Sequence, residues 1–187
     1  REIRIMEGLR SPFIVGFCGA VTIPGRLCLV TEFVPLGSLT NIFGRGVLTF
    51  IMKVLMCLDC ARGLQYLHGA KMIHRDLKPD NVLVISHDIS SMAVCKLSDF
   101  GSTREVGEEI ARTYSKMIGT PVYMAPEERE KKKRKCNPTL FSFTHNTPPK
   151  IKTKNKKTTQ VLDGKNRPTM NSDVYSFSIV TLQVFLE

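Results

Sequence analysis

The stretch "MIHRDLKPDNVLV", residues 72–84, places six polar or charged side chains between two apolar flanks. They are those of His74, Arg75, Asp76, Lys78, Asp80 and Asn81. A segment that only had to fold would not need that density, because buried polar groups cost free energy unless they are paired. The stretch therefore predicts a functional loop between a helix and a strand.

Apolar spacing predicts the elements around this loop. Residues 49–68 give the clearest helix, and helical patterns also cover residues 2–9 and 172–186. The stripe expected to face the core in the first of these consists of Phe50, Val54, Leu58, Ala61 and Leu64, widened by Ile51, Leu55 and Leu67. Strands are predicted in "RLCLVTEFV" (26–34), "NVLVI" (81–85) and "AVCKLSDF" (93–100), the last two as a hairpin. Ser38 is a predicted helix N-cap.

Composition is that of an ordinary globular protein, with 42% hydrophobic and 24% charged residues among 187. No apolar run reaches the roughly 18 residues that a membrane-spanning helix needs. Of the six cysteines only Cys57 and Cys60 have the CxxC spacing of a zinc or redox site, and no second pair follows. They fall in an apolar helical pattern, so we expect reduced core thiols in an intracellular protein. Localisation is predicted as cytoplasmic, in this chain or in a cytoplasmic domain of a larger protein.

The net charge of +10 is confined to one segment. Residues 128–170 hold 13 of the 27 Lys and Arg residues but only 3 of the 17 Asp and Glu residues. The remainder of the chain is therefore neutral, and nucleic acid is not an expected partner. "KKKRK" (131–135) leaves a nuclear-import or nucleic-acid patch open, although a solvated charge run is the simpler interpretation.

The polar loop has the residues that phosphoryl transfer requires. Asp76 and Asn81 lie five apart, and Asp99 follows in the turn after a strand. Asp and Asn oxygens are hard ligands of the kind Mg²⁺ takes in phosphate sites. A carboxylate left off the metal accepts a proton from an incoming hydroxyl, and Lys78 brings positive charge to the phosphoryl group.

Four motifs together resemble those of eukaryotic protein kinases. "HRDLKPDN" (74–81) is similar to the catalytic loop and "DFG" (99–101) to the metal-binding turn. "GTPVYMAPE" (119–127) resembles the end of the activation segment, and "SDVYSFSIV" (172–180) the start of the helix that anchors the large lobe. The resemblance implies an α+β, two-lobe fold with a mostly helical C-lobe and a truncated N-lobe sheet.

The resemblance also implies the roles of individual residues. Asp76 is implied as catalytic base, Lys78 as a contact of the γ-phosphate, and Asn81 and Asp99 as Mg²⁺ ligands beside ATP. Thr31 is the implied gatekeeper, Glu32 and Val34 bind the adenine edge through their backbone, and Leu83 lies under the ring. The implied structural and regulatory residues are Glu2, His74, Arg75, Phe100, Thr120, Glu127 and Asp173, with Met6 and Phe17 joining His74 and Phe100 in an apolar spine.

Two details refine the class. Lys78 favours transfer to serine or threonine, whereas "LVTEF" (29–33) and "SDVYSF" (172–177) resemble the corresponding stretches of tyrosine kinases. This combination resembles the tyrosine-kinase-like group of serine/threonine kinases. Arg75 suggests control by activation-loop phosphorylation, because a guanidinium there can pair with a phosphate. The candidate phosphorylation sites are Ser102, Thr103, Thr113, Tyr114 and Ser115.

The resemblance starts within the small lobe, so we expect a domain that is incomplete at both ends. The expected organisation is an N-lobe remnant and hinge (1–34), a C-lobe part (35–127), a basic insert (128–160) and a C-lobe continuation (161–187). The expected function is ATP-dependent phosphorylation of protein serine or threonine. The alternative is a catalytically inactive, kinase-derived binding module or gene remnant.

Overall fold

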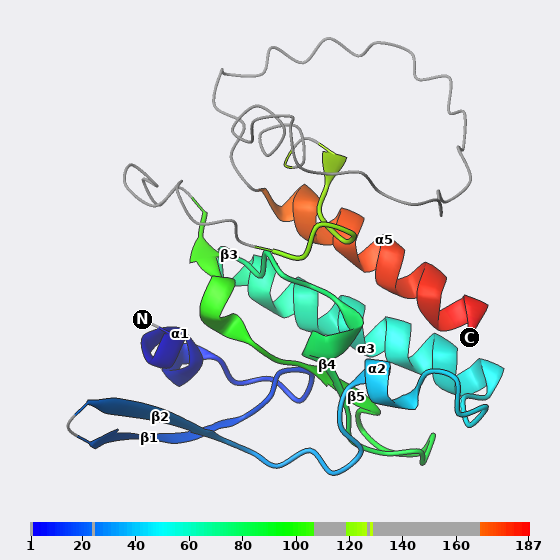
Figure 1. Cartoon of the computed structure of the whole chain (residues 1–187), viewed down its shortest axis with the longest axis horizontal. Coiled ribbons are helices and arrows are strands. Elements are labelled where there is room, and N and C mark those ends of the chain that lie inside the picture. The colour runs from blue at the N-terminus through cyan, green and yellow to red at the C-terminus, as the bar shows by residue number, and fades with distance from the viewer. Residues whose placement is uncertain (1, 24, 107–118, 127, 129–168) are drawn as a thin grey trace, which may run out of the picture.

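The computed structural model of the chain describes residues 2–23, 25–106, 119–126, 128 and 169–187 (Figure 1). These residues form an α+β arrangement with three two-stranded antiparallel sheets, β1–β2, β3–β6 and β4–β5. The main elements are α1 (Glu2–Gly8), β1 (Phe17–Ile23), β2 (Arg26–Thr31), α2 (Leu39–Ile42), α3 (Phe50–Gly69), β4 (Val82–Val84), β5 (Cys95–Leu97) and α5 (Met170–Leu186). The short elements are β3 (Met72–Ile73), β6 (Arg104–Glu105) and the 3-10 helices η1 (Pro79–Asn81) and η2 (Phe100–Ser102).

The predicted helices and strands are confirmed within the described residues. The hairpin expected over 81–100 is present, with Leu83 of β4 directly opposite Lys96 of β5. Ser38 is the N-cap of α2, as predicted. Among the helices that the structure describes, none combines the length and the apolar character that crossing a bilayer demands. The expected basic insert lies outside the described residues, apart from Glu128.

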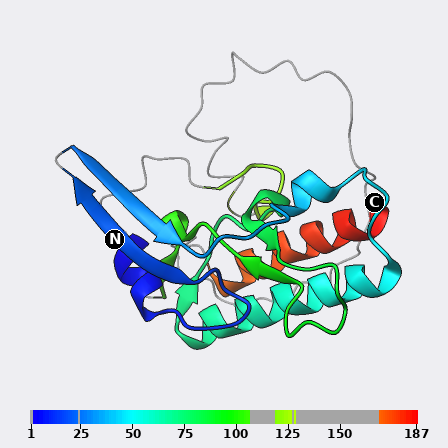
Figure 2. The ribbon, with the colours of Figure 1, turned by 90° about the horizontal axis from the view of Figure 1, so that it is seen from below.

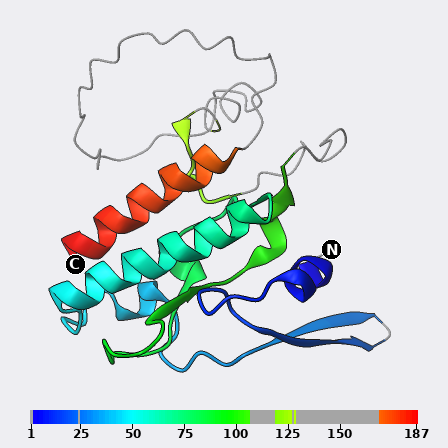
Figure 3. The same ribbon diagram turned by 180° about the vertical axis from the view of Figure 1, so that it is seen from behind.

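Helices α3 and α5 lie side by side and run in opposite directions (Figures 1 and 3). The ring of Phe50, at the start of α3, is 5.9 Å from that of Phe185, near the end of α5. At the other end of the pair, the side chain of His68 on α3 reaches Asp173 on α5. The two helices are thereby joined at both ends. Through Asp173, α5 also contacts the start of the loop between β3 and β4.

The predicted core face of α3 is wrong for its first half. Phe50, Ile51, Val54 and Leu58 are exposed, although Leu64 and Leu67 are buried as expected. The buried face is Met52, Met56, Asp59, Cys60, Gly63, Leu64 and Leu67. The helix is apolar around most of its circumference, so spacing alone does not identify which side packs against the strands.

Strand β5 lies at the centre of the packing that supports the site. The backbone of Leu97 donates to the carbonyl of Phe13 and accepts from the amide of Val15, each at 2.9 Å. Gly63 of α3 packs so closely on β5 that a Cβ there would lie 2.9 Å from Leu97 Cδ1. The helix, the strand and the segment before β1 therefore form one unit.

The hairpin β1–β2 projects from this unit at the end where α1 lies (Figure 2). Val21, Ile23 and Val30 are exposed on it. Cys18 and Cys28 are exposed as well, so the prediction of core thiols is wrong for those two. It is right for Cys60 and Cys95, whose Sγ atoms lie 3.8 Å apart in the interior.

Candidate active site

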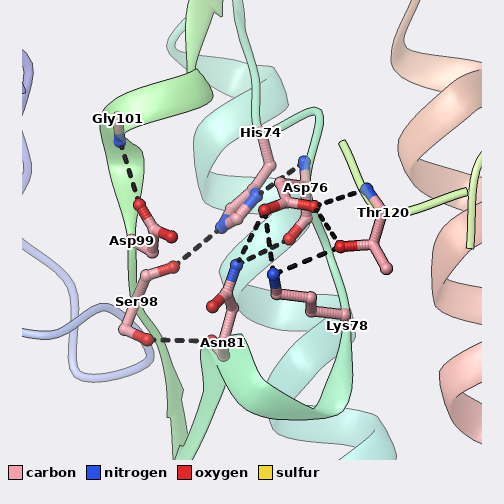
Figure 4. A network of polar contacts seen from close by, with 8 residues as sticks. All are labelled: His74, Asp76, Lys78, Asn81, Ser98, Asp99, Gly101 and Thr120. Carbon is pink, nitrogen blue, oxygen red and sulfur yellow. Dashed lines mark hydrogen bonds and ion pairs between the residues drawn. The ribbon is translucent and has the colours of Figure 1, made fainter. Parts of the chain in front are cut away.

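The loop between β3 and β4 presents Asp76 to a small group of polar side chains (Figure 4). Asp76 Oδ1 accepts hydrogen bonds from the amide and the hydroxyl of Thr120, at 3.0 and 3.1 Å. Its other oxygen, Oδ2, lies 3.3 Å from Lys78 Nζ. Because Lys78 also donates to Thr120 Oγ1 at 3.2 Å, the three side chains form a closed set.

The same loop fixes Asn81 beside the turn that carries Asp99. Asn81 Nδ2 donates to the carbonyl of Asp76 at 2.8 Å, which turns its Oδ1 away from the loop. The Asn81 carbonyl accepts from both the amide and the hydroxyl of Ser98, at 2.9 and 3.1 Å. Asn81 is therefore hydrogen-bonded directly to Ser98, the residue that precedes Asp99. Figure 4 shows the side chains of Asn81 and Asp99 on either side of Ser98.

This donor set fits a magnesium ion. Asn81 Oδ1 and the Asp99 carboxylate are hard oxygen ligands from two segments held together by Ser98, and only two protein ligands are needed when phosphate and water supply the others. Asp99 has a left-handed backbone, with φ of 61°, and its Oδ1 accepts from the amide of Gly101 at 3.4 Å. Such conformations cluster at functional sites because the surroundings must enforce them.

Asp173 of α5 holds the first residues of the loop between β3 and β4. Its side chain is buried, and its two oxygens accept from the amides of His74 and Arg75, each at 2.8 Å. Arg75 has a φ of 74°, an uncommon value for a residue with a side chain. His68 Nε2 lies 2.9 Å from Asp173 Oδ2. Helix α5 thereby holds the strained backbone that precedes Asp76.

His74 and Phe100 link the loop to the turn at Asp99. Both side chains are buried, their ring centroids lie 5.5 Å apart, and His74 Nε2 is 3.0 Å from the carbonyl of Ser98. Met6 of α1 is buried in the same core cluster, and Phe17 packs against it. The apolar side chains expected to form a spine are thus gathered in one core.

Glu2 lies at the start of α1, next to the turn at Asp99. Its Oε2 is 3.5 Å from the position a Cβ would take at Gly101. Burial raises the pKa of Glu2, and the nearby charge of Asp99 raises it further. A cation placed between these two carboxylates would relieve their repulsion.

The residues expected around adenine lie on two adjoining segments. Thr31 ends β2, and Glu32 and Val34 follow it. The chain then runs antiparallel to β4, where Ser38 faces Leu83 and the carbonyl of Gly37 accepts from Val84 N at 2.7 Å. Thr31 is exposed, while Glu32, Val34 and Leu83 are half-buried. The structure thus places Leu83 beside the segment that follows β2.

A pocket opens beside Asp76, on the side of α5. Its lining includes Asp76, Gly119, Thr120, Tyr123, Ser172 and Ser176. The segment 119–126 is fastened to α5, because Tyr123 donates to Gln183 Oε1 at 2.8 Å and Ser176 donates to the Tyr123 carbonyl at 2.8 Å. Gly119 has a φ of 93°, and a Cβ there would lie 3.0 Å from the Arg75 carbonyl. Segment 119–126 is thereby held against α5 and beside the loop that carries Asp76.

Some of the predicted residues cannot be placed. Glu127 and the candidate phosphorylation sites Thr113, Tyr114 and Ser115 lie outside the described residues. Thr103 is fully buried, which contradicts its place among the candidate phosphorylation sites, because a kinase cannot reach a buried hydroxyl.

Sequence reasoning missed His68, Lys96, Ser98 and Tyr123. Each acts through a partner that is distant in the sequence, such as Asp173 for His68. For Lys96 the sequence does offer a hint, since a lysine stands in an otherwise apolar strand. The alternation of strand residues alone would place that side chain in solvent.

Comparison with known proteins finds similarity to protein kinases. Residues 1–142 match the family model described as "Protein kinase domain". The chain is 35% identical over 173 residues to the "Probable serine/threonine-protein kinase gdt9" of Dictyostelium discoideum, covering 76% of this chain and 11% of that protein. It is 42% identical over 148 residues to the "Probable serine/threonine-protein kinase SIS8" of Arabidopsis thaliana, covering 76% and 14%.

A third relative is the "Serine/threonine-protein kinase STE20" of Saccharomyces cerevisiae, 36% identical over 127 residues, which are 67% of this chain and 13% of that protein. The chain therefore spans only a small part of the curated relatives it matches.

Proposed function

We propose that this chain, which belongs to the protein kinase family, supplies the catalytic loop of an enzyme that transfers the γ-phosphate of ATP to serine or threonine hydroxyls of proteins. One observation carries the proposal. Asp76, Lys78 and Thr120 form a closed polar set, and Asn81 of the same loop is bonded to the residue before Asp99. Phosphoryl transfer needs this combination of a proton acceptor, positive charge and metal ligands in one place.

Asp76 is the proposed proton acceptor. The hydroxyl oxygen of the substrate forms a bond to the γ-phosphorus, its proton passes to the Asp76 carboxylate, and the bond between the γ-phosphorus and its bridging oxygen breaks to release ADP. Thr120 and Lys78 orient the carboxylate, and Lys78 offsets charge on the phosphoryl oxygens. Magnesium held by Asn81 and Asp99 would neutralise phosphate charge.

The finer assignments are part of the same proposal. The adenine edge meets the backbone at Glu32 and Val34, with Thr31 behind it and Leu83 beneath it. We assign the chain to the tyrosine-kinase-like group, because Lys78 is combined with "LVTEF" (29–33) and "SDVYSF" (172–177). A cytoplasmic location is supported by Cys60 and Cys95, which lie close together as free thiols.

The test compares two single substitutions in the full-length protein that contains this chain. Asp76→Asn should lower phosphate transfer to casein by about 10²- to 10⁴-fold, the usual contribution of a catalytic proton acceptor. Asp80→Asn removes an equal charge four residues away, on an exposed side chain, and should leave transfer unchanged. Equal activity in Asp76→Asn and wild type would contradict the proposal.

A further inference from the structure

The side chain of Glu32 joins three segments behind the proposed adenine position. Its Oε1 accepts a hydrogen bond from the amide of Gly16 at 2.7 Å and also contacts Lys96 Nζ of β5. The backbone amide of Glu32 in turn donates to the carbonyl of Gly16 at 2.9 Å. Gly16 and Glu32 are thus bonded reciprocally, and Lys96 closes the group from the strand side.

Lys96 is well placed to hold this carboxylate still. It lies opposite Leu83 in the β4–β5 pair, and its neighbour Leu97 is bonded through both backbone groups to the segment 13–15. The Lys96 side chain is 16% exposed, so its ammonium comes from a rigid strand and from a largely enclosed position. Holding a lysine side chain in one conformation costs rotamer entropy, and here that cost is met on folding, before any ligand binds.

The charge of Glu32 is maintained at this position. Burial acts to raise the pKa of Glu32, but the hydrogen bonds from Lys96 and from the Gly16 amide, with the Lys96 charge, outweigh it and lower the pKa below its ordinary value. The carboxylate is therefore ionised at neutral pH. Since the Glu32 side chain is 34% exposed, such a pair adds little to stability, and its consequence is positional.

We infer that Lys96 is a positioning residue for nucleotide binding, which it serves by holding the Glu32 carboxylate and so the course of the backbone at 32–34. The inference rests on the proposed function, because it takes the nucleotide to bind at that backbone. A hinge segment fixed before binding loses less conformational entropy when the nucleotide arrives, which increases affinity. We call the group of Gly16, Glu32 and Lys96 the hinge clamp.

The first test needs no nucleotide. Amide hydrogen exchange is measured at Gly16 and Glu32 in the full-length wild-type protein and in three variants. Lys96→Gln removes the charge, Lys96→Arg keeps it, and Lys53→Gln removes a charge from α3 as a control. Exchange at both amides should quicken in Lys96→Gln alone. Unchanged exchange in Lys96→Gln would overturn the hinge clamp.

The second test measures the dissociation constant of a fluorescent ATP analogue with Mg²⁺ for the same proteins. Lys96→Gln should weaken binding by about 3- to 10-fold, whereas Lys96→Arg and Lys53→Gln should bind like the wild type. Equal affinity in Lys96→Gln and wild type would overturn the positioning role, even if the protein transfers phosphate.

The outcomes separate the two claims. A wild type that binds the analogue in a Lys96-dependent manner but transfers no phosphate to casein would retain the inference and remove the proposed function. A wild type that binds no analogue would overturn the positioning role and the proposed nucleotide site together.

Discussion

Asp173 controls the geometry of a loop that lies almost a hundred residues before it in the sequence. Its carboxylate accepts from two consecutive amides, those of His74 and Arg75, and so holds Arg75 in a left-handed conformation. A buried carboxylate is costly unless its oxygens are satisfied, and His68 supplies the remaining side-chain contact at 2.9 Å. The side chain of His68 on α3 therefore acts, through Asp173, on the backbone next to Asp76.

His68 gives a prediction at this scale. His68→Leu should lower the free energy of unfolding by about 1.5–3 kcal/mol, because a hydrogen bond to a charged group is lost, and should quicken amide exchange at His74 and Arg75. His68→Gln, which keeps a donor, should recover much of both losses. Chemical denaturation and residue-resolved exchange check this, with the exposed Gln65→Leu as control. Slow exchange in His68→Leu, equal to that of the wild type, would refute it.

Single residues differ in how far sequence can predict them. Asp76, Asn81 and Asp99 stand in motifs whose spacing is itself the signal. The structure bonds Asn81 to Asp76 and to Ser98, the residue before Asp99, while the roles of the three residues stay a prediction. His68 and Lys96 have partners 105 and 64 positions away, and no local pattern encodes such pairings. Only the fold brings those charges together, so sequence reasoning assigned them no role.

Among the elements, helix α3 shows where periodicity is insufficient. The pattern predicted the helix correctly but placed Phe50, Val54 and Leu58 in the core, and all three are exposed. The face that is buried contains Gly63, which permits the close approach of β5. Shape at the contact decides the orientation of this helix, and a count of apolar residues does not contain that information.

Gly63 provides a test of that contact. In Gly63→Ala a Cβ would meet Leu97 Cδ1 at 2.9 Å and the Phe13 carbonyl at 3.0 Å, so overpacking should cost about 1–3 kcal/mol. Gly69→Ala, at the end of the same helix, meets nothing within 4 Å and should be neutral or slightly stabilising. Urea unfolding of both variants measures the difference. Equal stability of the two variants would show that the α3–β5 contact is looser than described.

Asp59 makes the same interface sensitive to pH. It is buried in α3, where Oδ2 accepts from the amides of Val94 and Cys95 at 2.7 and 3.3 Å. Burial raises the pKa of Asp59, and the hydrogen bonds with the charge of Arg62 reverse only part of that effect. The folded state then binds the proton more tightly than the unfolded state, so ionisation of Asp59 destabilises the fold.

The wild type should therefore gain stability relative to Asp59→Asn as the pH falls from about 7 to about 4. Melting temperatures of both proteins across this range check the sign. A difference that stays constant with pH, or that falls as the solution becomes more acidic, would contradict the raised pKa.

For the whole molecule, the family and the α+β class were predictable because the motifs occur in a fixed order along the chain. The charge distribution was equally informative, since it separated the basic segment from a neutral remainder. The expected insert at 128–160 and the division into lobe parts stay predictions. The exposed apolar residues of α3 and of the β1–β2 hairpin were not predictable, because they depend on which surfaces meet in three dimensions.

The central claim is that these residues form a site for a nucleotide and magnesium, and the melting temperature of the full-length protein tests it most directly. A ligand that binds the folded state at 100 times its dissociation constant stabilises it by about 2.7 kcal/mol. ATP with Mg²⁺ should therefore raise the melting temperature of the wild type and of Asp76→Asn, which retains the binding groups, but not that of Asp99→Asn. No shift in the wild type, or an equal shift in Asp99→Asn, would contradict the site and favour a kinase-derived binding module without nucleotide chemistry.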